Sequence, residues 1–246
     1  MTSRFDVTRR AKGQASGALI LVILIVFALA LAMAHPAQAH ADEAAETSDS
    51  PLPLWSRNVG SYFDDNFSAV AAAPDGGCLL GGTFGSGSAS LGGHDFGDGD
   101  GFVSGMGIVR LDAWGGVVWA RGIDSLDARL NGFAPTADGG FVAVGSTFGP
   151  STNLGANDWG NAGYSDAVAL KLSADGTVEW AHNYGGDSFE GFGSVAALPD
   201  GGFLAVGGTI GASDNLGAND WGAEPGGGEA LAVRLDAQGD VLWARV

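Results

Sequence analysis

The stretch DGGFLAVGGT, from Asp200 to Thr209, joins a glycine turn to a short apolar segment, and this combination decides the fold class. The same Asp-Gly-Gly turn begins at Asp75 and at Asp138, so it returns after 63 and then 62 residues. Glycine readily adopts the positive φ that a tight hairpin turn needs. A hairpin signal that returns at a nearly constant interval predicts repeated copies of one β-sheet unit.

Tryptophans follow the same interval. They are separated by 64, 61 and 63 residues and stand at Trp55, Trp119, Trp180 and Trp243. Each copy also contains four short apolar segments, which in the second copy cover residues 132–136, 141–147, 167–172 and 177–182. These segments are rich in Val, Ala, Phe and Trp and are bounded by glycine, which favours strands over helices. Four antiparallel strands per copy predict the blade of a β-propeller.

At DGGFLAVGGT, and at RLDAQG (residues 234–239) followed by Trp243, the chain resembles a known group of proteins. The group comprises the tandem propeller-type repeats of secreted and surface proteins of bacteria. The resemblance covers Trp55 to Val246. It implies a repeat architecture with a structural or binding role, and it implies no particular activity.

The predicted fold class is therefore all-β and β-propeller-like, with three four-stranded blades and one extra N-terminal outer strand. The repeats cover approximately residues 60–121, 122–182 and 183–246, and the extra strand covers residues 54–57. The third repeat already has its own outer strand, at residues 241–246. Since three blades and a spare strand cannot close a ring, we expect a piece of a longer repeat protein or a subunit that completes its ring by association.

The N-terminus carries an export signal. A basic leader precedes an apolar run from Ala18 to Ala34, and Ala37-Gln38-Ala39 offers a cleavage site. We expect a signal peptide over residues 1–39, or an uncleaved membrane anchor as the alternative, followed by a disordered acidic linker over 40–54. The protein is then exported and extracellular, on the cell surface or periplasmic.

The formal net charge is −17, and the leader holds four of the eleven basic residues, so the exported part is more acidic still. Such a surface repels nucleic acid and anionic lipid and favours cations. The expected partners are a protein, a glycan or further copies of the chain. We expect no nucleic acid and, apart from an uncleaved anchor, no membrane. The lone Cys78 lies in an apolar segment, where we expect it to pack in the core.

The sequence NLGANDWG occurs at residues 153–160 and again at 215–222, with a looser copy at 90–97. One interpretation is a folded loop whose polar side chains bind its own backbone. The alternative is a repeated ligand site, in which Asp95, Asp158 and Asp220 offer oxygen ligands to Ca²⁺. In a third interpretation, Trp159 and Trp221 stack on a sugar ring. We expect no other metal and no other cofactor.

Basic residues precede the tryptophan of each repeat by a fixed distance. A two-residue turn would place them opposite that tryptophan, in the pairs Arg110–Trp119, Lys171–Trp180 and Arg234–Trp243. We expect cation–π contacts across these pairs. The chain offers no catalytic residue, and it is not expected to be an enzyme. It is predicted to be an exported non-catalytic repeat module for binding or surface structure. The alternatives are a Ca²⁺- or glycan-binding propeller and a propeller hydrolase or quinoprotein.

Overall fold

The computed structural model describes residues 55–246 with the exception of 61–63, 85–90, 92–104, 126, 161–162 and 223–226. The described residues belong to one unit of the chain, Pro53–Val246. The predictions for the signal peptide and the linker lie outside the described residues. Within the described part, no helix is both long and apolar enough to traverse a bilayer.

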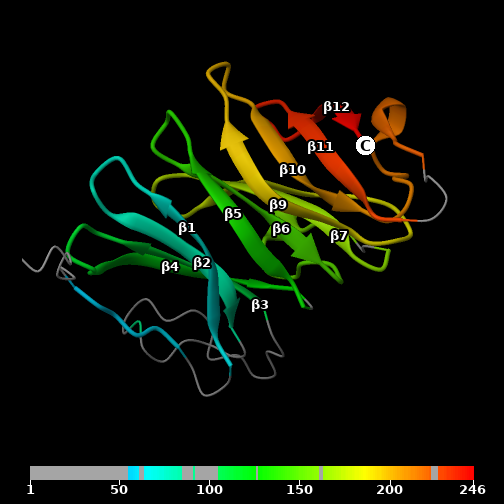
Figure 1. Ribbon diagram of the computed structural model, residues 1–246. Coiled ribbons are helices and arrows are strands. Elements are labelled where there is room, and N and C mark those ends of the chain that lie inside the picture. The colour runs from blue at the N-terminus through cyan, green and yellow to red at the C-terminus, as the bar shows by residue number, and fades with distance from the viewer. Residues whose placement is uncertain are drawn as a thin grey trace, which may run out of the picture. The chain divides into compact units, whose positions relative to one another are not determined.

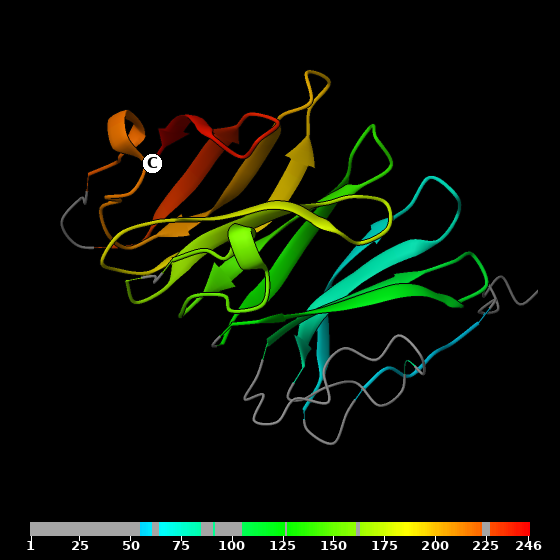
Figure 2. The same ribbon diagram turned by 180° about the vertical axis from the view of Figure 1, so that it is seen from behind.

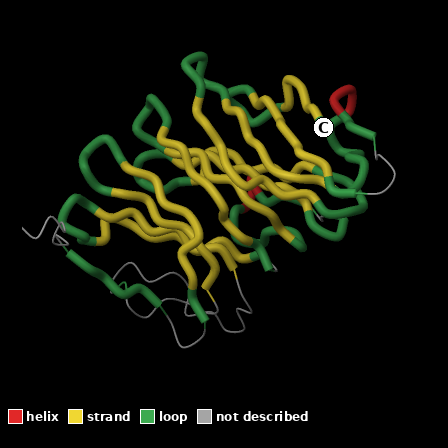
Figure 3. Tube along the Cα trace, in the orientation of Figure 1, coloured by secondary structure: helices red, strands yellow, loops and turns green. Residues whose placement is uncertain are grey.

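The described residues form three four-stranded antiparallel sheets, in which the strands follow one another in chain order (Figures 1 and 3). Blade 1 contains β1 (Asn66–Ala72), β2 (Cys78–Phe84), β3 (Gly105–Leu111) and β4 (Val117–Asp124). Blade 2 contains β5 (Arg129–Pro135), β6 (Phe141–Thr147), β7 (Asp166–Leu172) and β8 (Val178–Tyr184). Blade 3 contains β9 (Glu190–Ala197), β10 (Phe203–Thr209), β11 (Glu229–Leu235) and β12 (Val241–Arg245). The predicted all-β, propeller-like fold is confirmed, and the three blades do not close a ring within the described residues.

The Asp-Gly-Gly turns join the first and second strands of each blade as expected. Their first glycines, Gly76, Gly139 and Gly201, have φ values of 85°, 85° and 87°. The aspartate that precedes each glycine accepts a hydrogen bond from the backbone N–H two residues later, as from Gly140 to Asp138 at 3.0 Å. Side chain and backbone therefore close the turn together, and the strand that follows starts at a defined residue.

The core lies between the blades. The first strands β1, β5 and β9 contact one another in sequence, and blade 2 lies between the other two blades (Figures 1 and 2). Because side chains alternate along a strand, Phe141 and Ala143 of β6 face blade 1, while Val142 and Val144 face blade 3. Cys78 packs against a smaller cluster on the other face of blade 1 as predicted, but it is only partly buried.

The N-terminal segment does not form the outer strand that the sequence predicted. Residues 55–60 belong to no strand. A strand is held by a ladder of backbone bonds to a neighbour, and no described strand pairs with this segment. The segment is nevertheless attached to blade 1 through two side chains. Trp55 Nε1 donates to the carbonyl of Ala113 at 3.1 Å, and Arg57 Nη1 donates to the carbonyl of Gly115 at 2.9 Å.

Candidate functional site

The two NLGANDWG loops have the same internal hydrogen bonds. In the loop of blade 2, Asp158 Oδ1 accepts from the backbone N–H of Leu154 at 2.9 Å and from the hydroxyl of Ser151 at 2.9 Å. The same hydroxyl accepts from the backbone N–H of Trp159 at 3.0 Å. Between them, residues Gly155–Asn157 form one 3₁₀ turn. The aspartate therefore closes the loop around this turn, which is the folded-loop interpretation of the motif.

The loop of blade 3 repeats this network. Asp220 Oδ1 accepts from Leu216 N at 2.8 Å and from Ser213 Oγ at 3.0 Å, and Ser213 Oγ accepts from Trp221 N at 2.9 Å. The second asparagine of each motif anchors the loop to the outer strand of its own blade, with Asn219 Nδ2 donating to Val241 O at 2.9 Å. The first asparagine binds the outer strand of the preceding blade, since Asn153 Nδ2 donates to Gly122 O at 3.1 Å and Asn215 Nδ2 donates to Asn183 O at 3.3 Å. Every polar residue of the motif thus helps to hold the loop in place.

The structure places the predicted ligand residues as follows. Asp158 and Asp220 are exposed, each in its own loop, and each uses Oδ1 within that loop. Asp95 lies outside the described residues. Trp159 and Trp221 are buried, with 4% and 6% of their surface exposed, so sugar stacking on either indole would require its loop to open. Among the described residues, no group of three His, Cys, Asp or Glu side chains is positioned to hold a metal ion.

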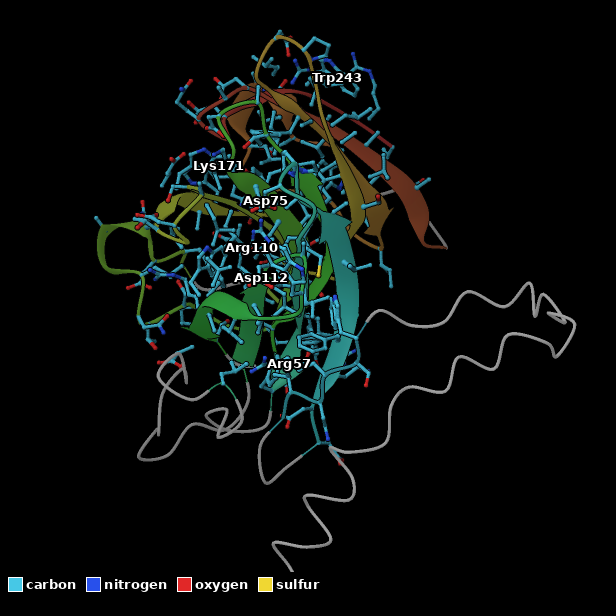
Figure 4. The ribbon with its side chains drawn as sticks, turned by 90° about the vertical axis from the view of Figure 1, so that its left-hand side faces the viewer. Arg57, Asp75, Arg110, Asp112, Lys171 and Trp243 are labelled. Atoms are coloured by element: carbon cyan, nitrogen blue, oxygen red, sulfur yellow. The ribbon has the colours of Figure 1, made fainter. Side chains whose placement is uncertain are left out.

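The basic residues stand opposite the tryptophans as predicted, although a bulge in each hairpin, and not the predicted two-residue turn, sets this pairing. Their charged ends point elsewhere, so the prediction of cation–π contacts across these pairs was wrong. Each pairs with the aspartate of the Asp-Gly-Gly turn in the same blade, in the ion pairs Arg110–Asp75, Lys171–Asp138 and Arg234–Asp200. Figure 4 labels both members of the first pair, Arg110 and Asp75. A carboxylate attracts a cation more strongly than an aromatic ring does, and it also accepts its hydrogen bonds.

The tryptophans instead join neighbouring blades. Trp119 Nε1 of blade 1 donates at 2.9 Å to the carbonyl of Ala174, in the β7–β8 turn of blade 2. Two residues later, Arg121 Nε donates at 2.6 Å to the carbonyl of Gly176 in the same turn. Gly176 has a φ of 84° and lies against the indole, where an added Cβ would come within 2.7 Å of Trp119 Cδ2. We call this arrangement the tryptophan–turn joint.

The joint recurs between blades 2 and 3. Trp180 Nε1 donates to the carbonyl of Ala237 at 2.9 Å, and His182 Nε2 lies 3.2 Å from the carbonyl of Gln238. The contacts of Trp55 and Arg57 with the β3–β4 turn form a third copy, since an added Cβ on Gly115 would lie 2.8 Å from Trp55 Cδ2. Three tryptophans therefore each engage the turn of the blade that follows them.

The fourth tryptophan is different. Within the described part of the chain, no carbonyl accepts a hydrogen bond from the indole of Trp243. The guanidinium of Arg245 folds back instead, with Cζ 5.7 Å from the centre of the Trp243 ring and Nη1 donating to Ala244 O at 2.6 Å. Figure 4 shows Trp243 at the blade 3 end and Arg57 at the blade 1 end of the same view. At blade 3 the tryptophan and arginine of the joint are therefore present, but no described turn accepts a hydrogen bond from the indole.

No described strand or loop covers the sheet surface beside Trp243. It corresponds to the surface of blade 2 that packs against blade 3, and we call it the open face. Val206, in the repeat position of the fully buried Val144, is 42% exposed. The described side chains that define the open face are Leu204, Val206, Ala230, Ala232 and Trp243. Arg234 lies on the same face, between Leu204 and Trp243. The open face is the candidate functional site, and apart from Arg234 it consists of residue types that elsewhere in the chain form the core.

A pair of buried carboxyl groups marks the boundary between blades 2 and 3. Asp166, at the start of β7, is 2% exposed, and Glu190, at the start of β9, is 3% exposed. Glu190 accepts hydrogen bonds from Thr209 Oγ1 at 3.0 Å and from Gly186 N at 3.1 Å, and Asp166 accepts from Asn183. Burial raises the pKa of each carboxyl group, and the neighbouring carboxylate adds to the increase at Glu190.

The two carboxyl groups lie on either side of Gly185. A Cβ at this position would lie 2.6 Å from Glu190 Oε2 and 2.7 Å from Asp166 Oδ1. The pair is enclosed and each of its oxygens has a donor, so it serves the packing of the two blades. Sequence analysis missed it because the two residues are 24 positions apart in the chain. The only local signal is an acid at the start of an otherwise apolar strand.

Comparisons with known proteins say little about this chain. No protein-family model matches it, and no curated protein matches it. Among solved structures, it is similar to a protein of unknown function from Bacteroides caccae, whose crystal structure was determined at 1.35 Å resolution. The TM-score is 0.35 and the identity is 10%, over 74% of this chain and 61% of that chain. This chain thus spans about three fifths of the length of the structure it matches.

Proposed function

We propose that this chain is an exported, non-catalytic repeat module that acts by binding at a surface, and that the open face of blade 3 is its binding surface. The observation that carries the proposal is the exposure of Val206 on the same face as Trp243, a face that is buried in blade 2. Exposed apolar side chains with polar neighbours such as Arg234 are characteristic of interaction sites. The basic leader and the apolar run of residues 18–34 support export.

The proposal is tested by the distribution of the protein between the producing cells and their medium. The variant Val206→Glu places a charge on the open face, and we expect it to lower the cell-bound fraction at least severalfold. Val118→Glu is a matched control, because Val118 is 48% exposed on the outer strand of blade 1. Equal retention of the wild type and both variants would exclude the open face as the binding surface. Turnover of a chromogenic glycoside or ester by the purified protein would contradict the non-catalytic part of the proposal.

Binding of Ca²⁺ by the NLGANDWG loops is the second candidate. It is favoured by the exposure of Asp158 and Asp220, whose Oδ2 atoms are not used in the loop networks described above. Ca²⁺ takes six to eight oxygen ligands, so each loop would have to add backbone carbonyls or water to its single carboxylate. Isothermal titration with Ca²⁺ tests this candidate directly. A site of this kind predicts saturable binding that Asp158→Ala and Asp220→Ala each reduce.

A further inference from the structure

The open joint at blade 3 has the same chemistry as the three completed joints. Each completed joint begins with Trp-x-Arg or Trp-x-His, and blade 3 offers Trp243-Ala244-Arg245. Trp119-Ala120-Arg121, which has the same three residues, binds the alanine and glycine carbonyls of the next turn. The indole and guanidinium of blade 3 are therefore a donor pair for a turn that contains Ala-x-Gly.

The chain contains one such turn that is held by a segment outside the blades. It is Ala113-Trp114-Gly115 of blade 1, which accepts the hydrogen bonds of Trp55 and Arg57. Trp55 is 38% exposed, whereas Trp119 in the equivalent joint is 9% exposed. The segment from residue 55 to 60 has no strand ladder to hold it. Of the three tryptophans that form joints, Trp55, which binds the turn of blade 1, is thus the least buried.

We propose that blade 3 of one chain docks on blade 1 of a second copy, with Trp243 and Arg245 replacing Trp55 and Arg57 at the turn Ala113–Gly115. This proposal rests on the proposed function, because it identifies the occupant of the open face. The contact joins two different surfaces and is therefore heterologous, so that it must either close a ring or continue as a filament. A closed pair of chains contains six blades, within the four to eight that propellers use.

The apolar surfaces also match in this arrangement. The face of blade 1 beneath the segment of Trp55 carries Val109 and Leu111, with Leu80 and Val117 packed beside them. Val109 and Leu111 are fully buried, and Val59 and Leu91 belong to the same cluster, so docking would have to displace this cover together with Trp55 and Arg57. The equivalent face of blade 2 packs against blade 1 in the core between those blades. Blade 3 would therefore meet blade 1 of a second copy through the same two faces that already pack twice within the chain. The described residues therefore contain, on blade 1, a surface complementary to the open face, and this favours a second copy as the occupant.

The first test is the mass of the purified exported chain in solution, measured by light scattering or sedimentation over a range of concentrations. We expect a concentration-dependent dimer. Trp243→Ala should raise its dissociation constant at least about 30-fold, as for tryptophans at the centre of an interface. Tyr164→Ala is the control, because Tyr164 is 66% exposed and belongs to no joint. It should leave the dissociation constant within about twofold of the wild type.

The second test frees the carbonyls of the turn Ala113–Gly115 from the side chains that bind them within the chain. Trp55→Ala combined with Arg57→Ala removes the resident donors, so association should become at least about tenfold tighter, and Trp243→Ala in the same chain should return it to the monomer. Association that persists in the triple variant would come from another surface and would overturn the proposal, as would a monomeric double variant at the highest concentration. If the wild type is a monomer and Val206→Glu still lowers its retention on cells, the proposed function stands, but a second copy is excluded as the partner.

Discussion

Blades 2 and 3 have nearly the same sequence at their second strand, FVAVGST in β6 and FLAVGGT in β10, but they have different surroundings. Blade 2 is covered on both faces, and Val142 and Val144 are fully buried. Blade 3 is covered on one face, and Val206 is 42% exposed. The comparison shows that the repeat determines which residue types occupy a face, whereas the presence of a neighbouring blade determines whether they form core or surface.

The largest expected effect tests this contrast directly. Val144→Glu would place an unpaired charge between blades 2 and 3, and we expect it to lower the free energy of unfolding by about 4 kcal/mol or more. Val206→Glu changes the equivalent residue of blade 3 and should cost less than about 0.5 kcal/mol in the monomer. Urea unfolding followed by tryptophan fluorescence measures both. A large loss of stability in the Val206 variant would mean that the open face is covered within the monomer.

The tryptophans provide the next contrast. Trp119→Ala empties a joint in which the indole is 9% exposed, so we expect a loss of about 3–5 kcal/mol in the free energy of unfolding. Trp243→Ala removes an indole that lacks an acceptor among the described residues, and the expected loss is about 1 kcal/mol. Both variants should be compared at a concentration at which the wild type is monomeric. Equal losses would show that Trp243 already has a joint within its own chain.

The NLGANDWG loops should behave alike in the two blades. Asp158→Ala and Asp220→Ala each remove an acceptor of two hydrogen bonds, so each is expected to lower the free energy of unfolding by about 1–2 kcal/mol. If the loops are structural, these losses are the same with millimolar Ca²⁺ and with chelator. Melting curves of the wild type and both variants test this. A loss that appears only in the presence of Ca²⁺ would identify the aspartates as ligands.

The smallest expected effect is a pH dependence at the boundary of blades 2 and 3. Because burial raises the pKa of Asp166 and of Glu190 in the folded state, the folded protein binds protons more readily than the unfolded chain does. These two groups therefore increase stability as the pH falls from neutral towards about 4. Asp166→Asn should reduce this increase, and the exposed control Asp187→Asn should retain it. Thermal midpoints from pH 7 to pH 4 provide the measurement, and identical profiles would contradict the assignment.

Further acidification should reverse the trend. Hydrogen bonds and the neighbouring cation lower the pKa of the turn aspartates Asp75, Asp138 and Asp200, with that of Asp138 falling to about 2. A lowered pKa contributes stability above the unfolded value, and this contribution is lost as the pH falls from about 4 to about 2. Stability should therefore be greatest at mildly acidic pH. A steady decline from pH 7 downwards would show that the buried pair has no net influence.

Much of the fold was predictable because its signals are local. Asp-Gly-Gly specifies a turn through the positive φ of its glycine, and the alternating apolar residues after it specify a strand. The opposition of Arg110 and Trp119 was predicted from a two-residue turn, but Leu111 pairs with Val117 and a bulge next to this pair brings Arg110 opposite Trp119. The actual partners of these two side chains did not follow, because Asp75 reaches Arg110 from another hairpin and Ala174 reaches Trp119 from another blade.

The sequence by itself thus determined the repeat, the four strands of each blade and their register, since these depend on residues close together in the chain. Only the tertiary structure decided which tryptophans are buried in loops and which join neighbouring blades. It also brought Asp166 and Glu190 together beside Gly185. It also decided that no turn among the described residues accepts a hydrogen bond from the indole of Trp243. The physical reason is that burial and hydrogen bonding between blades depend on which surfaces meet, and a repeated sequence presents the same surfaces at every copy.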